Sequence, residues 1–161
     1  MVRPAHPDDA LAICEIYNHY ILHTTITFEE DPLTPDEMRE RIVDTIQTCP
    51  WFVCEEDGEV LGYCYGRKWR ARAAYRHSVE ATVYLDASAV GKGRGTALFG
   101  ALLAELRAGH QFHCVIGGVA LPNPASIALL EKFGLCQVAH FREVGRKFDR
   151  WIDVAYWQLL L

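Results

Sequence analysis

The sequence has 161 residues, of which 50% are hydrophobic and 23% are charged, and its formal net charge is −5 at pH 7. This length and composition are typical of a globular protein with a substantial hydrophobic core, so we expect a single domain over residues 1–161. The acidic balance argues against a nucleic-acid partner held by a broad basic surface. The sequence has no apolar run of membrane-spanning length and no apolar signal-peptide core, which predicts no membrane contact and a cytoplasmic location.

The first third of the chain predicts two helices after a short edge strand at residues 2–5. Pro7 opens the first helix, as first turns prefer. Its apolar face is expected to consist of Ala10, Ile13, Cys14, Tyr17 and Ile21. A capping box from Thr34 to Glu37 begins the second helix, which runs to about Thr48.

Two strands and a basic loop come next. Residues 51–55 and 60–67 are expected to form strands joined by the acidic turn Glu56-Asp57-Gly58. The segment 68–77 then carries basic and aromatic side chains, among them Trp69, Arg70, Arg72, Tyr75 and Arg76. Arginine pairs bidentately with anionic groups and aromatic rings exclude water, so this loop is either a wall of a small-molecule pocket or a solvated turn.

The stretch from Glu80 to Thr96 organises the rest of the chain. It begins as a strand with Ala81, Val83 and Leu85 on one face and Glu80, Thr82 and Tyr84 on the other. Alternating glycines follow, and then a helical pattern formed by Leu98, Leu102 and Leu106, with Gly109 placed to end it. A glycine-rich turn at a helix N-terminus leaves backbone N–H groups free for an anion. We therefore predict a phosphate or pyrophosphate site here.

The last third continues the alternation of strands and helices. A strand at 114–119 precedes a helix that opens at Asn123-Pro124 and ends at Phe133-Gly134, and strands at 136–142 and 151–159 close the chain. This order indicates an α/β fold. The six cysteines form no Cys-x-x-Cys pair and are interpreted as free thiols, most of them buried. The seven histidines lack metal-ligand spacing, so no metal is expected.

Three phosphate-binding patterns compete for the glycine turn. A P-loop places Gly-Lys-Ser/Thr at the helix start, whereas Lys92 lies between two glycines. A dinucleotide fingerprint reads Gly-x-Gly-x-x-Gly near the start of a fold, which also differs. The third pattern, Gln/Arg-x-x-Gly-x-Gly/Ala, holds the coenzyme A pyrophosphate in the GCN5-related N-acetyltransferases (GNAT). The turn resembles that pattern, with Val90 in place of the usual Gln or Arg.

The resemblance extends over nearly the whole chain and is greatest to the phosphinothricin and methionine sulfoximine acetyltransferases. The matching segments are Tyr17-Asn18-His19-Tyr20-Ile21, Thr24, Phe28, Thr34-Pro35, Pro50-Trp51, Trp69-x-Ala71-Arg72-x-Ala74-Tyr75, Val79-Glu80-x-Thr82-Val83-Tyr84 and Trp151-x-Asp153-Val154. The resemblance implies the GNAT fold, a mixed central sheet of about six to seven strands flanked by about four helices. It also implies acetyl-CoA as co-substrate, a small amino acid as acceptor and a homodimer.

The resemblance further assigns residues to the acetyl-CoA site. The edge of the strand should bind the pantetheine arm, and the turn should bind the pyrophosphate, with charge from Lys92 and Arg94 at its rim. The implied residues are Val83, Tyr84, Leu85, Gly91, Lys92, Gly93, Arg94, Gly95, Thr96, Asn123 and Ser126. A backbone N–H near Leu85 is the expected oxyanion donor. Asn123 is also a good helix N-cap, and the two roles can coexist.

Glu80 matches the family position of the general base that removes a proton from the attacking amine. The implied substrate pocket consists of Phe28, Trp69, Arg70, Arg72, Tyr75 and Arg76. Leu130 departs from the family, because many relatives have a Tyr or His there that can protonate the leaving thiolate. Ile152 replaces a His common in phosphinothricin enzymes, and therefore favours methionine sulfoximine or methionine sulfone. A non-catalytic acyl-CoA-binding module and a peptide or protein N-acetyltransferase remain as alternatives.

Overall fold

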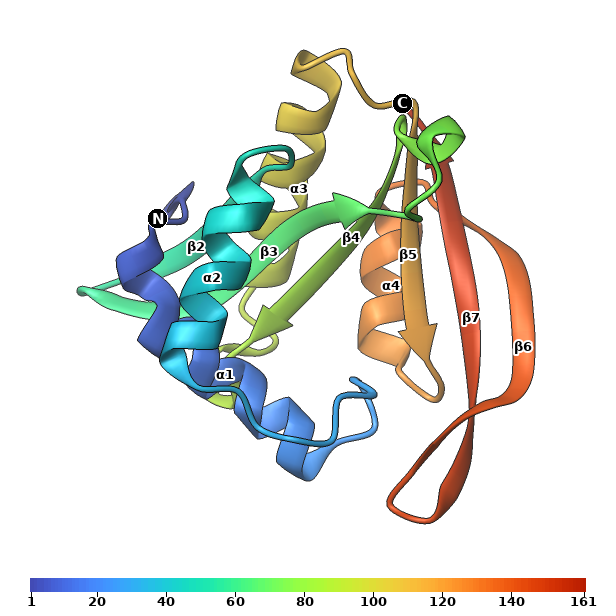
Figure 1. Cartoon of the computed structure of the whole chain (residues 1–161), viewed down its shortest axis with the longest axis horizontal. Coiled ribbons are helices and arrows are strands. Elements are labelled where there is room, and N and C mark those ends of the chain that lie inside the picture. Colours follow the sequence, from blue (N-terminus) through green and yellow to red (C-terminus); the bar gives the residue numbers. More distant parts are fainter.

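In the computed structural model, which describes all 161 residues, the chain forms one mixed sheet with α-helices on both faces (Figure 1). The seven strands are β1 (Val2–Pro4), β2 (Trp51–Glu56), β3 (Glu59–Lys68), β4 (Ser78–Leu85), β5 (Cys114–Ala120), β6 (Cys136–Lys147) and β7 (Arg150–Leu160), in the order β1-β2-β3-β4-β5-β7-β6. The four α-helices are α1 (Ala10–His23), α2 (Pro35–Ile46), α3 (Arg94–Ala108) and α4 (Pro124–Lys132). The predicted α/β class and the predicted size of the sheet are confirmed.

Two hydrophobic cores lie on opposite faces of the sheet. Side chains of α1 and α2, including Ile13 and Ile42, pack against Tyr84 of β4. Side chains of α3, including Leu102, pack on the other face against Ala81 of the same strand. The alternation predicted for β4 is therefore confirmed, because successive side chains of a strand point to opposite faces.

The helix ends differ from the sequence expectations in two places. α2 has the predicted capping box, but it ends at Ile46, before Thr48, because the chain turns there to place Cys49 in the core. α3 ends at Gly109 as expected, yet Gly109 stays right-handed at a φ of −72°. The next residue, His110, takes the left-handed φ of 51°. Gly109 thus ends the helix without the left-handed conformation for which glycine is favoured at helix ends.

The central sheet opens between β4 and β5. These two parallel strands pair only at Ser78–Cys114, Val79–Val115 and Glu80–Ile116. Beyond this point β4 remains paired with β3, and β5 remains paired with β7 as far as Ala120. One edge of β4 after Glu80 therefore has no neighbouring strand, which leaves backbone hydrogen-bonding groups free for another partner.

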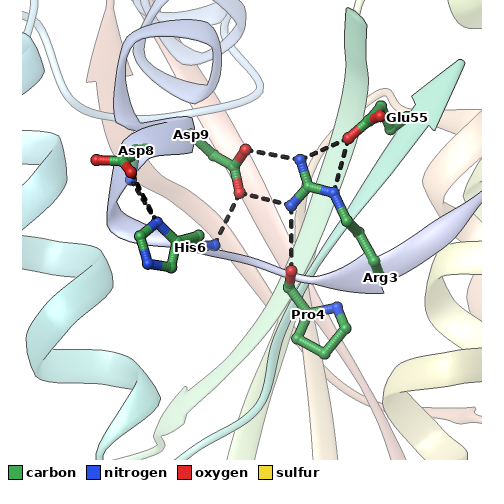
Figure 2. Close-up of polar contacts among 6 residues, drawn as sticks. All are labelled: Arg3, Pro4, His6, Asp8, Asp9 and Glu55. Atoms are coloured by element: carbon green, nitrogen blue, oxygen red, sulfur yellow. Dashed lines mark hydrogen bonds and ion pairs between the residues drawn. The ribbon is translucent and has the colours of Figure 1, made fainter. Parts of the chain in front are cut away.

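Arg3 ties the edge strand β1 to β2 and to the start of α1 (Figure 2). Its Nη1 and Nη2 donate to the two carboxylate oxygens of Asp9 at 2.9 and 2.8 Å, and its Nε donates to Glu55 at 2.7 Å. Asp9 also accepts a hydrogen bond from the backbone N–H of His6 at 2.8 Å. Burial would raise the pKa of Asp9, but the hydrogen bonds from Arg3 and His6 lower it overall. The pair thus favours the ionised carboxylate in the folded state.

Five cysteines are buried and unpaired, as predicted for most of them, whereas Cys136 at the start of β6 is exposed. None of the helices combines the length and the apolar character that a membrane span requires.

We predict that Asp9→Asn lowers the free energy of unfolding by about 1–2 kcal/mol at neutral pH, because a bidentate charged hydrogen bond is lost. Since folding lowers the pKa of Asp9, this contribution is complete above the pKa of the unfolded carboxyl and disappears as pH falls through the folded pKa. Urea unfolding at several pH values measures the difference. The exposed neighbour Asp8 serves as control, and Asp8→Asn should cost much less. Equal losses in the two variants would contradict this role of Asp9.

Candidate active site

The glycine turn presents an open backbone surface at the N-terminus of α3. Gly91 and Gly93 have φ values of 80° and 78°, in the left-handed region that glycine tolerates best. Gly93 is the N-cap of α3, and no side chain caps this helix end. A Cβ atom added at either glycine would meet nothing within 4 Å, so the surface in front of the turn is free. Free N–H groups and open space are the two requirements of an anion site at a helix N-terminus.

A cleft of about 460 Å³ runs from this turn along the free edge of β4. Of the residues predicted for the cofactor, the structure brings together Val83, Tyr84, Leu85, Gly91, Gly93, Gly95, Thr96, Asn123 and Ser126 around it. Asn123 also caps α4, since its Oδ1 accepts a hydrogen bond from the backbone N–H of Ser126 at 3.1 Å. Both roles considered for Asn123 are therefore compatible with its position.

The charges at this cleft differ from the expectation. Lys92 and Arg94 do not line it, and the Arg94 guanidinium pairs instead with Glu56, with Nε 3.0 Å from Oε1. Lys132 at the end of α4 does line the cleft, and its Nζ lies 3.4 Å from Thr96 Oγ1. Sequence reasoning missed Lys132, because its place depends on how α4 packs beside α3.

A narrow cavity of about 60 Å³ continues from the cleft into the gap between β4 and β5. The 81–84 segment of β4 and the 117–120 segment of β5 form its walls, and Leu130 of α4 closes one side. Leu130 is buried, and a Cβ atom added at Gly117 would lie 2.7 Å from its Cδ1. Leu130 therefore packs directly on the backbone of β5, and it offers the gap an apolar surface without a proton donor.

Glu80 lies at the far side of the gap, in a third cavity of about 420 Å³. Its side chain is 14% exposed, and Oε2 accepts a hydrogen bond from Arg67 Nε at 2.7 Å. A Cβ atom at Gly118 would lie 3.2 Å from Glu80 Oε1 and 2.9 Å from the Tyr156 ring. Glycine at this position therefore lets the free oxygen of Glu80 face the gap. Ile26, Thr82 and Tyr84 line both this cavity and the gap, which joins the two spaces.

A second ion pair contributes to the wall of the Glu80 cavity through Glu29, which lines it. Glu29 accepts hydrogen bonds from Arg41 at 2.7 and 3.0 Å and from the Tyr17 hydroxyl at 3.0 Å. Burial would raise the pKa of Glu29, but the hydrogen bonds from Arg41 and Tyr17 lower it overall. Burial raises the pKa of Tyr17 to about 12, so this hydroxyl stays protonated at neutral pH. The wall thus carries an ionised carboxylate and a phenolic donor.

The residues predicted for the substrate pocket fall into two groups. Phe28 lines the Glu80 cavity and also the adjoining apolar groove of about 540 Å³, which Trp69 and Arg70 line as well. Trp69 contacts Tyr156 edge-to-face at 5.2 Å, and Arg70 lies 5.1 Å from the Trp69 ring. The other predicted residues, Arg72, Tyr75 and Arg76, line neither space and lie on an exposed 3₁₀ turn between β3 and β4. Ile152 is buried in β7 and also lines neither space.

The hairpin of β6 and β7 holds the loop that carries Phe28. Lys147 is buried near the hairpin tip, and its Nζ donates a hydrogen bond to the Thr27 carbonyl at 2.8 Å. Gly145 leaves room for the Phe28 ring, because an added Cβ atom would lie within 2.9 Å of three of its ring atoms. Sequence reasoning missed Lys147, since its partner is 120 residues away. These contacts fix the outer wall of the Glu80 cavity.

The arrangement combines an anion-binding turn, a free strand edge and a carboxylate at the end of a narrow gap. No group of three His, Cys, Asp or Glu side chains is arranged to hold a metal ion. The geometry suits a long phosphorylated ligand that lies along β4 and presents its tip to Glu80. Glu80 can then act on a second, smaller molecule in the neighbouring cavity as a proton acceptor.

Comparison with known proteins agrees with this geometry. The model of the acetyltransferase (GNAT) domain matches residues 2–156. The chain is 39% identical to a phosphinothricin N-acetyltransferase of Streptomyces coelicolor, over 98% of this chain and 94% of the relative. It is 34% identical to an L-methionine sulfoximine/L-methionine sulfone acetyltransferase of Salmonella typhimurium, over 99% and 94%. The structure of a Salmonella typhimurium acetyltransferase with its cofactor acetyl-CoA superposes with a TM-score of 0.97 at 34% identity, covering 100% and 93% of the two chains.

Proposed function

The chain belongs to the GNAT family of N-acetyltransferases, and on that premise we propose that it moves an acetyl group from acetyl-CoA to the α-amine of a small amino acid. The observation that carries this proposal is the continuous path from the glycine turn, through the gap between β4 and β5, to Glu80. The two similar enzymes named above act on phosphinothricin and on methionine sulfoximine or sulfone. Those three amino acids are the first substrates to test.

The residues of the cleft fit acetyl-CoA. The backbone of Gly91 to Thr96 would bind the pyrophosphate, with the Lys132 ammonium at the side of the cleft. The free edge of β4 at Val83 to Leu85 would hydrogen-bond the amides of the pantetheine arm as a neighbouring strand would. The apolar residues that line the cleft, among them Leu85 of β4 and Leu129 of α4, support this orientation.

Glu80 would serve as the general base. Bound acetyl-CoA supplies an acetyl group activated as a thioester. Glu80 Oε1 accepts, directly or through a water, the proton that the substrate ammonium must lose. The freed nitrogen then forms a bond to the acetyl carbon as the carbon–sulfur bond breaks. A backbone N–H near Leu85 would stabilise the charge on the carbonyl oxygen.

Leu130 affects how the departing sulfur of coenzyme A can gain a proton at the end of the reaction. The departing sulfur must take up a proton or leave as the thiolate, and Leu130 cannot donate one. Its contact with Gly117 makes it a packing residue of the gap wall. We therefore assign this proton to water, which leaves Glu80 as the one acid–base side chain of the reaction.

The boundaries and the lining of the cavities also favour some acceptors over others. Phe28 and the β6–β7 hairpin bound the Glu80 cavity on one side, which leaves more room for a free amino acid than for an extended peptide. An aliphatic side chain would enter the adjoining apolar groove. Ile152 lines neither space, so its resemblance to the methionine sulfoximine relatives is what makes methionine sulfoximine and methionine sulfone better candidates than phosphinothricin. A peptide N-acetyltransferase is the alternative, and acetylation of peptides with none of the three amino acids would favour it.

We predict that Glu80→Gln lowers the turnover of methionine sulfone by about 10²- to 10⁴-fold, because the amide keeps the size of the side chain but cannot accept the proton. Acetyl-CoA affinity, measured by calorimetry, should stay within about threefold, since Glu80 does not line the pyrophosphate cleft. Release of the coenzyme A thiol measures turnover. Glu29→Gln provides the comparison, because Glu29 is the other carboxylate that lines the same cavity. A full loss in Glu29→Gln with an active Glu80→Gln would assign the base role to Glu29.

We predict that Gly93→Val weakens acetyl-CoA binding by well over tenfold, because a side chain on a left-handed residue blocks close approach to the backbone. Gly58→Val is the matched control. Gly58 has a φ of 83° and equally free space around it, but it lies in the β2–β3 turn and does not line the cleft. Both variants should lose similar stability, and only Gly93→Val should lose affinity in calorimetric titration. Unchanged affinity in folded Gly93→Val would remove the turn from the cofactor site.

We further propose that the chain forms a homodimer that covers the apolar groove. Large apolar side chains of the β6–β7 hairpin are 51–63% exposed, namely Val138, Phe141, Val144, Phe148 and Trp151. β6 is also an edge strand with one free side. An exposed apolar surface of this kind is typical of an interface between subunits.

Light scattering tests the dimer. Val138→Asp should convert the dimer to a monomer at micromolar concentration, because it buries a charge in the interface. Leu11→Asp, at an equally exposed apolar residue on α1, should leave the dimer intact. A wild-type protein that is monomeric, or a dimer that only Leu11→Asp dissociates, would contradict this interface.

A further inference from the structure

Arg67 is the one basic residue among those that line the Glu80 cavity. The arginines expected from the sequence to bind the substrate lie elsewhere: Arg70 lines the apolar groove, and Arg72 and Arg76 line neither space. An anionic group that enters the Glu80 cavity therefore meets Arg67 as its nearest available cation. Sequence reasoning passed over Arg67 because it placed this residue at the end of a strand.

The register of the sheet places Arg67 beside Glu80. The two residues are direct cross-strand partners in the β3–β4 pair, so their side chains lie on the same face. Arg67 Nε and Nη2 both approach a single oxygen of Glu80, Oε2, at 2.7 and 2.6 Å. Nη1 donates no hydrogen bond to the protein, and the Arg67 side chain is 56% exposed. The guanidinium thus holds Glu80 and keeps donors free toward the cavity.

Glu29, the other carboxylate that lines this cavity, repels an anion. Its bidentate partner Arg41 is engaged with it and does not line the cavity. A carboxylate in this cavity is therefore drawn toward Arg67 and away from Glu29. A protonated amine has the opposite preference, and Glu80 Oε1 is the free carboxylate oxygen beside Gly118 that it can reach.

An α-amino acid carries its amine and its carboxylate on the same carbon. The group that binds the carboxylate must then lie next to the group that takes the proton from the amine. Arg67 and Glu80 meet this requirement, because one is hydrogen-bonded to the other and each keeps a free polar atom. An arginine fork suits a carboxylate in particular, since its planar donors match the two oxygens.

We propose that Arg67 binds the α-carboxylate of the acceptor and so places the α-amine at Glu80. This inference rests on the proposed function, in which Glu80 is the base. It predicts that good acceptors carry a negatively charged carboxylate on the carbon that bears the amine. Simple amines lack this carboxylate, and the N-terminal residue of a peptide has a neutral amide in its place, so both are then poor acceptors.

The test compares methionine sulfone with its primary amide, which has the same side chain and amine but no negative charge. We expect the wild-type protein to favour the acid in kcat/KM, and we expect Arg67→Met to reduce this preference by roughly 10- to 150-fold. Any change that Arg67→Met causes in Glu80 acts on both acceptors, so it cancels in the ratio. Arg67→Lys, which keeps the charge but not the fork, should give an intermediate ratio.

Matched variants test whether the change in acid preference is specific to Arg67. Arg39→Met removes another partly exposed arginine that pairs with a carboxylate, Asp8, outside the site, and it should leave the ratio unchanged. A ratio that stays within about threefold of wild type in folded Arg67→Met would overturn the inference. A large loss of the preference for the acid in Arg72→Met or Arg76→Met, with the preference unchanged in Arg67→Met, would also overturn it. That result would assign carboxylate binding to the loop arginines. Undiminished activity in Glu80→Gln would instead refute the base role of Glu80 on which this inference rests, and no acetylation of any of the three amino acids by the wild-type protein would refute the proposed function.

Discussion

The structure depends on the separation of β4 from β5. The two strands pair for three residues and part after Glu80 and Ile116, because β4 stays with β3 while β5 follows β7. An unpaired strand edge inside a sheet is costly unless a partner satisfies its backbone groups. In this protein the free edge leads from the glycine turn to Glu80, so the same irregularity creates the cleft that we propose for acetyl-CoA and leads it to the proposed base.

Small residues and ion pairs give the site its shape. Gly117 admits the Leu130 side chain and Gly118 leaves space for Glu80 and Tyr156, so two adjacent glycines of β5 set the width of the gap. Two ion pairs, Arg67–Glu80 and Glu29–Arg41, contribute side chains to the lining of one cavity. Charges of both signs in one cavity can orient a molecule that carries both charges, such as a free amino acid.

Local patterns predicted the fold and most of the residues that line the cleft along β4, whereas long-range packing decided which side chains line the cavity that holds Glu80. Alternation along β4 and the glycines before α3 could be recognised because their geometry depends on near neighbours. The partners of Arg67 and Lys147 depend on strand register and on a contact across the chain, which one sequence does not show. The loop arginines followed a residue pattern, and the structure places Arg72 and Arg76 outside the cavity that holds Glu80.

Hydrogen–deuterium exchange with and without acetyl-CoA tests whether the cofactor binds between β4 and β5, since it reports on the backbone groups of the free edge. We expect saturating acetyl-CoA to slow amide exchange in residues 81–85 of β4 and 91–96 of the glycine turn. Exchange in the β1–β2 region around Arg3 should not change. Protection confined to other parts of the chain, with none in these two segments, would contradict the placement of the cofactor between β4 and β5.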